Sequence, residues 1–197
     1  MGAYIFFGIL LALIVLPIVG YNRLVSCRQS FKNAFAQIDV QLKRRHDLIP
    51  SLVETARTYL GHEKDTLAAV IAARNHAQAA GSAAATAVGK PHATQAVASA
   101  ESALSTSIAR FMAVAEAYPE LKASETMQQL SEELSSTENR IGFARQAYND
   151  SVADYNTARE SFPQNFLAAM FGFYPAAYLE STSSEAERAA PVVKFGA

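Results

Sequence analysis

Imidazole is a common metal ligand and general base in proteins, so the four histidines are the first residues to test for chemistry. They are His46, His62, His76 and His92, and no pair of them has the spacing of a metal site. His62-Glu63 begins like the zinc-binding helix of a metalloprotease, but the second histidine position is Thr66. We therefore expect solvated surface histidines and no metal site.

A basic triplet, Lys43-Arg44-Arg45, could bind lipid headgroups or nucleic acid, but such patches usually carry four or more basic residues. The triplet lies in a helical pattern, and Arg45 falls where that pattern asks for an apolar residue. We expect a solvated face with Arg45 turned inward, where a lone charge is costly and must be paired. Its candidate partners on the last helix are Glu133, Glu138 and Asn139.

Two dipeptides, Tyr148-Asn149 and Tyr155-Asn156, lie seven residues apart and hence on one helix face. They predict interhelical hydrogen bonds that fix the register of the bundle. The sequence has no glycine-rich phosphate loop, no nucleophile elbow and no evident pair of carboxylates in a pocket. It therefore predicts no catalytic, cofactor-binding or metal-binding residues and no cofactor.

The longest helical pattern in the chain runs from Ser124 to Phe162. Ser124 is a candidate N-cap, and Pro163 provides the stop. A rod of this length with one narrow apolar stripe needs partner helices of similar length. The stripe consists of Met127, Leu130, Leu134, Thr137, Ile141, Ala144, Tyr148, Val152, Tyr155 and Phe162.

A second rod is predicted from Tyr21 to about Gln78. At Pro50 the rod either kinks, which we favour, or gives way to a new helix after Asp47. Residues 79–92 are rich in glycine and alanine and predict a turn. A third helix follows over 93–117, and the short junction at 118–120 requires an antiparallel neighbour. The seam of the first rod consists of Phe31, Phe35, Ile38, Leu42, Ile49, Leu52, Ala56, Tyr59, Leu67, Val70 and Ile71.

Residues 1–21 carry no charged side chain and are long enough to span a bilayer. The segment is either a permanent membrane anchor, which we favour, or a cleaved signal peptide, or the leader of a lipoprotein box at 24–27. A signal peptide would begin with basic residues, and this segment has none. Arg23, Arg28 and Lys32 follow the span, so we expect the remaining chain in the cytoplasm. The prediction is a single-pass membrane protein.

Aromatic residues crowd the segment 162–178, and no charge lies between Glu160 and Glu180. The segment could cap the open end of the bundle, or it could be an exposed patch for another subunit or the membrane interface. Beyond it, 181–190 is polar and predicts a flexible tail, and 191–195 is apolar enough to dock. The predicted domains are an anchor at 1–21, a bundle with an aromatic cap at 22–180, and a tail at 181–197.

Composition supports an all-α chain held together by packing. Half of the 197 residues are hydrophobic, and the net charge of -1 provides no field for nucleic acid. The single cysteine, Cys27, excludes an intramolecular disulfide framework. We expect about four long antiparallel helices with coiled-coil-like seams behind one transmembrane helix.

Several short strings, in order along nearly the whole chain, resemble the bacterial LemA family. Ser124 and Met127 replace an asparagine and a phenylalanine of the family pattern, both mild changes. The strings are YNRLV at 21–25, IDVQLKRR at 38–45, DLIP at 47–50, HE at 62–63, EAYPELKA at 116–123 and TENRI at 137–141, then Ala144-Arg145, both Tyr-Asn pairs with Val152, and Phe162-Pro163.

The resemblance implies a membrane helix followed by an antiparallel bundle, a location in the bacterial inner membrane and no enzyme activity. Family members include a magnetosome membrane protein and are often encoded near membrane metalloproteases, which suggests membrane organisation with such partners. We expect a self-associating or partner-recruiting scaffold. The alternative is a lipid-binding or membrane-shaping module that uses Lys43, Arg44 and the aromatic segment. An enzyme with a hidden site between helices is the least favoured reading.

Overall fold

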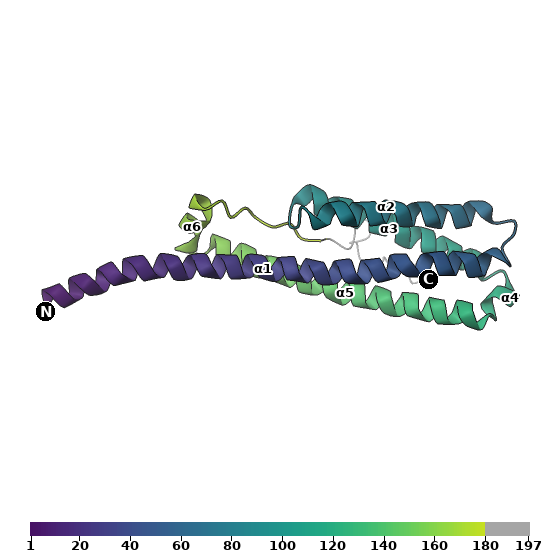
Figure 1. Ribbon diagram of the computed structural model, residues 1–197, viewed down its shortest axis with the longest axis horizontal. Coiled ribbons are helices and arrows are strands. Elements are labelled where there is room, and N and C mark those ends of the chain that lie inside the picture. The colour runs from purple at the N-terminus through teal and green to yellow at the C-terminus, as the bar shows by residue number, and fades with distance from the viewer. Residues whose placement is uncertain (180–197) are drawn as a thin grey trace, which may run out of the picture.

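The computed structural model describes residues 1–179, which form an elongated all-α molecule without strands (Figure 1). Four long helices form the bundle, as the sequence predicts. The expected tail at 181–197 lies outside the described residues. The helices are α1 (Gly2–Arg57), α2 (Lys64–Ala85), α3 (Pro91–Ala115), α4 (Pro119–Lys122), α5 (Glu125–Glu160) and α6 (Gln164–Met170).

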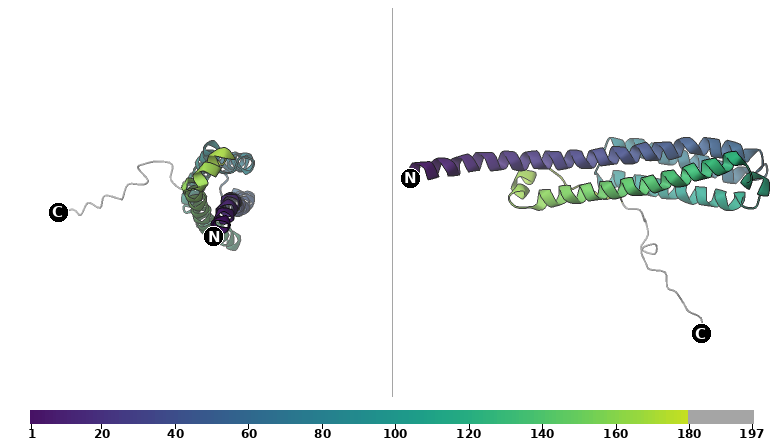
Figure 2. Two further views of the ribbon diagram at one scale, coloured as in Figure 1. Left: turned by 90° about the vertical axis from the view of Figure 1, so that its left-hand side faces the viewer. Right: turned by 90° about the horizontal axis from the view of Figure 1, so that it is seen from below.

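The bundle consists of two antiparallel helix pairs that lie side by side (Figure 2). One pair is α1 with α5, and the other is α2 with α3; α1 also packs against α2. The short helix α4 joins α3 to α5 at the end of the bundle far from the N-terminus, while α6 lies at the opposite end. Helix α1 projects beyond the bundle as a single rod (Figure 1).

Helix α1 runs unbroken through Pro50 and ends at Arg57, so neither a new helix after Asp47 nor a rod to Gln78 is correct. Pro50 has no N–H to donate to the carbonyl of His46. Arg74 Nε of α2 donates to that oxygen instead, at 3.1 Å. The chain then turns at 58–63, where the N–H of buried Leu60 donates to Ala56 O at 2.9 Å.

The turn expected at 79–92 is shorter than predicted, because α2 continues to Ala85 and α3 already begins at Pro91. Alanine is the best helix former, so an alanine-rich run extends the helix although its composition resembles a loop. The turn itself is closed by Gly89, which has φ +83°, a conformation that favours glycine. Pro91 suits the first position of a helix, since its missing N–H would have no partner there.

Helix α5 confirms most of the predicted stripe: Met127, Leu134, Ile141, Tyr148 and Tyr155 are buried. Ser124 occupies the N-cap position but makes no side-chain cap bond. The helix ends at Glu160, two residues short of the prediction. Phe162 therefore leaves the stripe and is 80% exposed.

A layer of polar residues divides the core into two apolar clusters. The cluster nearer the projecting end of α1 contains Phe35, Ile38 and Tyr148, and the other contains Ile49, Leu104 and Phe111. Between them lie buried Arg45 and Glu101. A charged layer at one level disfavours a shifted register of the helices, because a shift would leave charges buried without partners.

Candidate functional site

Arg45 forms the centre of the polar layer and is fully buried, as the sequence predicts. Its Nη1 donates to Glu138 Oε2 of α5 at 2.5 Å and to Ser105 Oγ of α3 at 3.2 Å, and its Nη2 pairs with Glu101. Burial lowers the pKa of Arg45, while Glu138 opposes that shift. The guanidinium thus joins α1, α3 and α5. Of the three predicted partners, Glu138 is the correct one.

His46 belongs to the same layer, which corrects the expectation that every histidine is on the surface; His62, His76 and His92 are exposed. His46 Nε2 lies 2.9 Å from Glu101 Oε1. Desolvation, followed by the charges of Arg45 and Arg74, lowers the pKa of His46 to about 4. The imidazole is therefore neutral at pH 7 and donates its Nε2–H to Glu101.

The charges of the polar layer balance without a proton on His46. Arg45 and Arg145 are positive, Glu101 and Glu138 are negative, and Glu138 acts on the pKa of both arginines. The innermost pair, Arg45 and Glu101, is fully buried between the two apolar clusters, while Glu138 is half exposed and the Nε atoms of Arg45 and Arg145 have no hydrogen-bond partner within residues 1–179. The described residues also contain no group of three or more His, Cys, Asp and Glu side chains able to hold a metal ion. Through Arg45 the layer links α1, α3 and α5.

The other two residues of the basic triplet, Lys43 and Arg44, are solvent-exposed, as predicted. Arg44 Nη2 pairs with Glu133 Oε1 of α5 at 2.5 Å. The two residues lie about 33 Å along α1 beyond Tyr21, taking about 1.5 Å for each of the intervening residues. That distance exceeds the screening length of about 8–10 Å at physiological salt, so the end of the span lies out of their reach.

Both Tyr-Asn pairs of α5 hold an extended segment of their own chain, so the expected interhelical bonds are replaced by bonds to this segment. Residues 173–179, which we call the strap, run back along α5. Asn156 Nδ2 donates to Ala176 O at 2.9 Å, and Asn156 Oδ1 accepts the Ala176 N–H at 3.0 Å. Asn149 makes the same pair of bonds to Leu179, at 3.2 and 2.9 Å.

The tyrosine of each pair adds a bond to a strap carbonyl. Tyr148 donates to Ala177 O at 2.9 Å and Tyr155 to Tyr174 O at 2.8 Å. Burial raises the pKa of Tyr148 to about 12 and also raises that of Tyr155. Seven helical residues rise about 10.5 Å, and three extended residues span about 10 Å, so the two asparagines match strap residues three apart.

The aromatic segment is neither wholly a cap nor wholly a patch. Phe173 and Leu179 of the strap are buried against the bundle, and Arg28 lies 4.8 Å from the centre of the Phe173 ring. Phe162 and Phe166 face solvent. The buried strap residues fit the cap reading, whereas the contact of the exposed residues with another subunit or a membrane stays a prediction.

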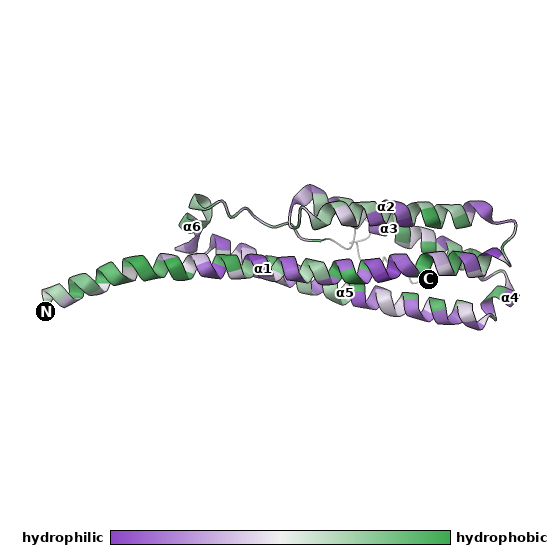
Figure 3. Cartoon of the chain, in the orientation of Figure 1, coloured by the Kyte–Doolittle hydropathy of each residue, from purple (hydrophilic) through white to green (hydrophobic). Residues whose placement is uncertain are grey.

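The boundary between the projecting part of α1 and the bundle lies at Gly20. Every side chain described between Gly2 and Val19 is exposed, and Gly20 is the first buried residue. Helix α6 rests against this point: a methyl group added at Gly20 would lie 2.9 Å from Leu167 Cδ1. By length and composition, α1 is able to cross a membrane, and Figure 3 shows its apolar end.

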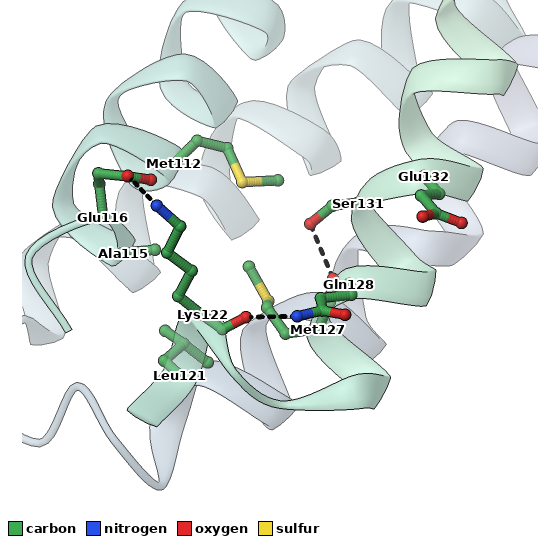
Figure 4. A pocket seen from close by; sticks show the side chains of 9 residues that line it. All are labelled: Met112, Ala115, Glu116, Leu121, Lys122, Met127, Gln128, Ser131 and Glu132. Atoms are coloured by element: carbon green, nitrogen blue, oxygen red, sulfur yellow. Dashed lines mark hydrogen bonds and ion pairs between the residues drawn. The ribbon is translucent and has the colours of Figure 1, made fainter. Parts of the chain in front are cut away.

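A pocket opens at the other end of the bundle, where α3, α4 and α5 meet (Figure 4). Its volume is about 360 Å³. Met112, Leu121 and Met127 contribute apolar walls, and an ion pair between Lys122 and Glu116 lies beside them. The lining contains no histidine or cysteine and no arrangement of a nucleophile with a base. The pocket can hold an apolar side chain, and Gln128, Ser131 and Glu132 are the remaining polar residues of its lining.

The residue that the sequence analysis missed is Glu101, although the pattern of its helix contains a signal for it. In the expected helix 93–117, Val97 and Leu104 mark the buried stripe, and Glu101 lies between them at a spacing of four and three. A carboxylate in an apolar stripe requires a buried cation, just as Arg45 in its own stripe requires an anion. Matching these two exceptions would have identified the pair.

Comparison with known proteins agrees with this architecture. Magnetosome protein MamQ of Magnetospirillum gryphiswaldense is 24% identical over 179 residues, which cover 83% of this chain and 66% of the relative. Magnetosome protein MamQ 2 of Paramagnetospirillum magneticum is 34% identical over 73 residues, or 37% of this chain and 27% of the relative. The chain thus matches just under two thirds of the first relative and about a quarter of the second.

The family comparison covers most of the chain and includes the polar layer and both Tyr-Asn pairs. The model of the LemA family matches residues 34–195 of this chain. This range contains every family string of the sequence except YNRLV at 21–25, and it covers most of the all-α bundle. The chain belongs to the LemA family.

Proposed function

We propose that this protein is a single-pass, membrane-anchored, non-enzymatic scaffold of the bacterial inner membrane, which self-associates or recruits another membrane protein. The observation that carries this proposal is the continuity of α1. One helix of 56 residues contains both the exposed apolar stretch and the first long helix of the bundle. The bundle is thereby attached without a flexible linker and extends about 54 Å from Tyr21 to the end of α1.

The chemistry of the bundle supports a scaffold more than an enzyme. Arg45, Glu101 and His46, the buried ionisable groups at its centre, are paired with one another and enclosed by apolar residues. The pocket at the far end has apolar walls and suits a side chain of a protein partner better than a reacting substrate. The likeness to magnetosome proteins is consistent with a membrane-associated helical protein.

The remaining features of the proposal come from the sequence. Arg23, Arg28 and Lys32 follow the span and favour a cytoplasmic bundle. A membrane metalloprotease is the candidate partner that the family resemblance suggests. The net charge of -1 argues against nucleic acid as a partner.

The test is the mass and shape of the full-length protein in mild detergent and in native membrane extract, by light scattering and electron microscopy. A discrete particle larger than one chain, or a stoichiometric co-purifying membrane protein, is the expected result. A monomer at micromolar concentration that co-purifies with nothing would refute the scaffold.

A lipid-binding or membrane-shaping module is the second candidate, and the exposed aromatic residues near α6 favour it. Lys43 and Arg44 give it little support, because Arg44 is already paired and both lie far from the span. Vesicle binding by this route would depend on apolar contact, so it should persist at high salt and without anionic lipid. Binding lost under both conditions would instead indicate the basic residues.

A further inference from the structure

Helix α6 presents two apolar faces but buries only one of them. Ala168 is buried and Leu167 contacts α1 at Gly20, which accounts for the inner face. Phe166 and Met170, four residues apart, lie on the outer face and are 64% and 75% exposed. Phe162 extends this face, since its ring centre lies 6.1 Å from that of Phe166. We call Phe162, Phe166 and Met170 the α6 patch.

The position of the α6 patch along α1 indicates what covers it. The exposed apolar residues Gly2–Val19 rise about 27 Å, close to the roughly 30 Å of a bilayer hydrocarbon core. Leu167 touches α1 at the next residue, Gly20, and Tyr21 contacts the ring of Phe171 at 5.1 Å between centres. Figure 2 likewise shows α6 beside α1 where α1 leaves the bundle. A bilayer around residues 2–19 therefore ends at the level of α6.

The chemistry around the α6 patch matches this boundary. No charged residue lies between Glu160 and Glu180, so nothing on α6 opposes contact with acyl chains. The first charges on either side of the patch are Arg23 on α1 and the Arg159–Glu160 ion pair on α5. They lie where α1 and α5 enter the bundle and suit the polar headgroup layer. Aromatic side chains are enriched at this depth of a membrane, and apolar faces bury about 5–10 Å into the boundary region.

We propose that α6 is a second membrane contact: its patch of Phe162, Phe166 and Met170 inserts into the interfacial layer of the bilayer that α1 crosses. This inference rests on the proposed membrane anchoring and extends it. Because α6 lies to one side of α1, two contact points would fix how the bundle is turned and tilted relative to the membrane.

The absence of tryptophan from the sequence makes the depth of each site measurable with one introduced fluorophore. Phe166→Trp and Met170→Trp report on the patch. Leu13→Trp reports on the span and Phe143→Trp, 74% exposed on α5, on the bundle surface away from α6. Each full-length variant is reconstituted in phosphatidylcholine vesicles containing lipids brominated either near the headgroup or near the chain ends, and circular dichroism checks its helix content.

The expected result is strong quenching of Leu13→Trp, no quenching of Phe143→Trp, and quenching of both patch variants that is greater with bromine near the headgroup. If Leu13→Trp is quenched and both patch variants behave like Phe143→Trp, the anchor holds and α6 is not a membrane contact. Blue-shifted but unquenched patch emission would assign the patch to a second copy and overturn the inference. An unquenched Leu13→Trp would refute the anchoring itself, and this inference with it.

Discussion

Replacing Glu101 by glutamine tests whether the polar layer stabilises the bundle through buried charge. The amide keeps the size of the side chain and an oxygen for Arg45 Nη2, while its NH2 group replaces the oxygen beside His46 Nε2, where a neutral imidazole can accept. What it removes is the negative charge beside a guanidinium with no exposed surface. Arg45 then retains only Glu138, whose side chain is 49% exposed.

Removing one partner of a buried ion pair costs about 3–5 kcal/mol. Because Glu138 still pairs with Arg45, we expect Glu101→Gln to cost about 3 kcal/mol, at the lower end of that range. For a chain of this size, that corresponds to a fall in melting temperature of roughly 6–12 °C. Glu133→Gln is the matched control, because the Arg44–Glu133 pair has side chains 47% and 40% exposed. An exposed pair of this kind contributes about 0–1 kcal/mol.

The assay is thermal and denaturant unfolding of the full-length variants in one detergent, followed by circular dichroism. The paired replacement Arg45→Met with Glu101→Met should recover most of the loss, because Glu138 is half exposed and can be solvated. Equal small losses for Glu101→Gln and Glu133→Gln would refute the view that burial gives the inner pair its larger effect.

Three further predictions concern pH, the strap and the proline. The pKa of His46 is about 4 in the folded state and 6.5 in the unfolded state, so the unfolded chain binds a proton there more readily. The free energy of unfolding therefore keeps its full value above pH 6.5 and falls by about 1–3 kcal/mol as the pH drops toward 4. His46→Gln should remove that loss in acid unfolding curves, and His62→Gln, at an exposed position, should not. Asn156→Ala removes two hydrogen bonds to the strap, worth about 1 kcal/mol each, and should speed hydrogen exchange over residues 173–179 while α5 stays protected. Unchanged exchange over the strap would show that Asn156 does not hold it. Arg74→Met should cost about 1–3 kcal/mol, because it leaves the carbonyl of His46 unpaired. The cost should be clearly smaller in a Pro50→Ala background, where the N–H of residue 50 donates to that carbonyl, and full additivity in the double-mutant cycle would contradict this account.

Much of the bundle follows from side-chain periodicity. Phe31, Phe35, Ile38 and Leu42 recur at steps of three and four and are all buried. The errors arose where local sequence and tertiary packing disagree. Only Gly61 marks the turn at 58–63, which is closed by burial of Leu60, a residue with no turn preference of its own.

The partners of individual side chains were harder to predict than the helices that carry them. Periodicity shows that Arg45 points inward, but the choice between Glu133, Glu138 and Glu101 depends on the register and height of three helices. Likewise, Asn149 and Asn156 were correctly placed on one face. Their hydrogen-bond partner is an extended segment beyond the end of the helix, and no spacing within α5 points to it.

The unbroken course of α1 makes the molecule a lever. Membrane-spanning helices tilt by about 20° on average, and α1 extends about 54 Å beyond Tyr21, so an average tilt displaces the far end by about 18 Å. The pocket between α3, α4 and α5 lies at that end and would make the whole movement. In the proposed membrane-anchored arrangement, a change in the tilt that α1 and the α6 patch together set would thus be converted into a lateral displacement of the far end of the bundle.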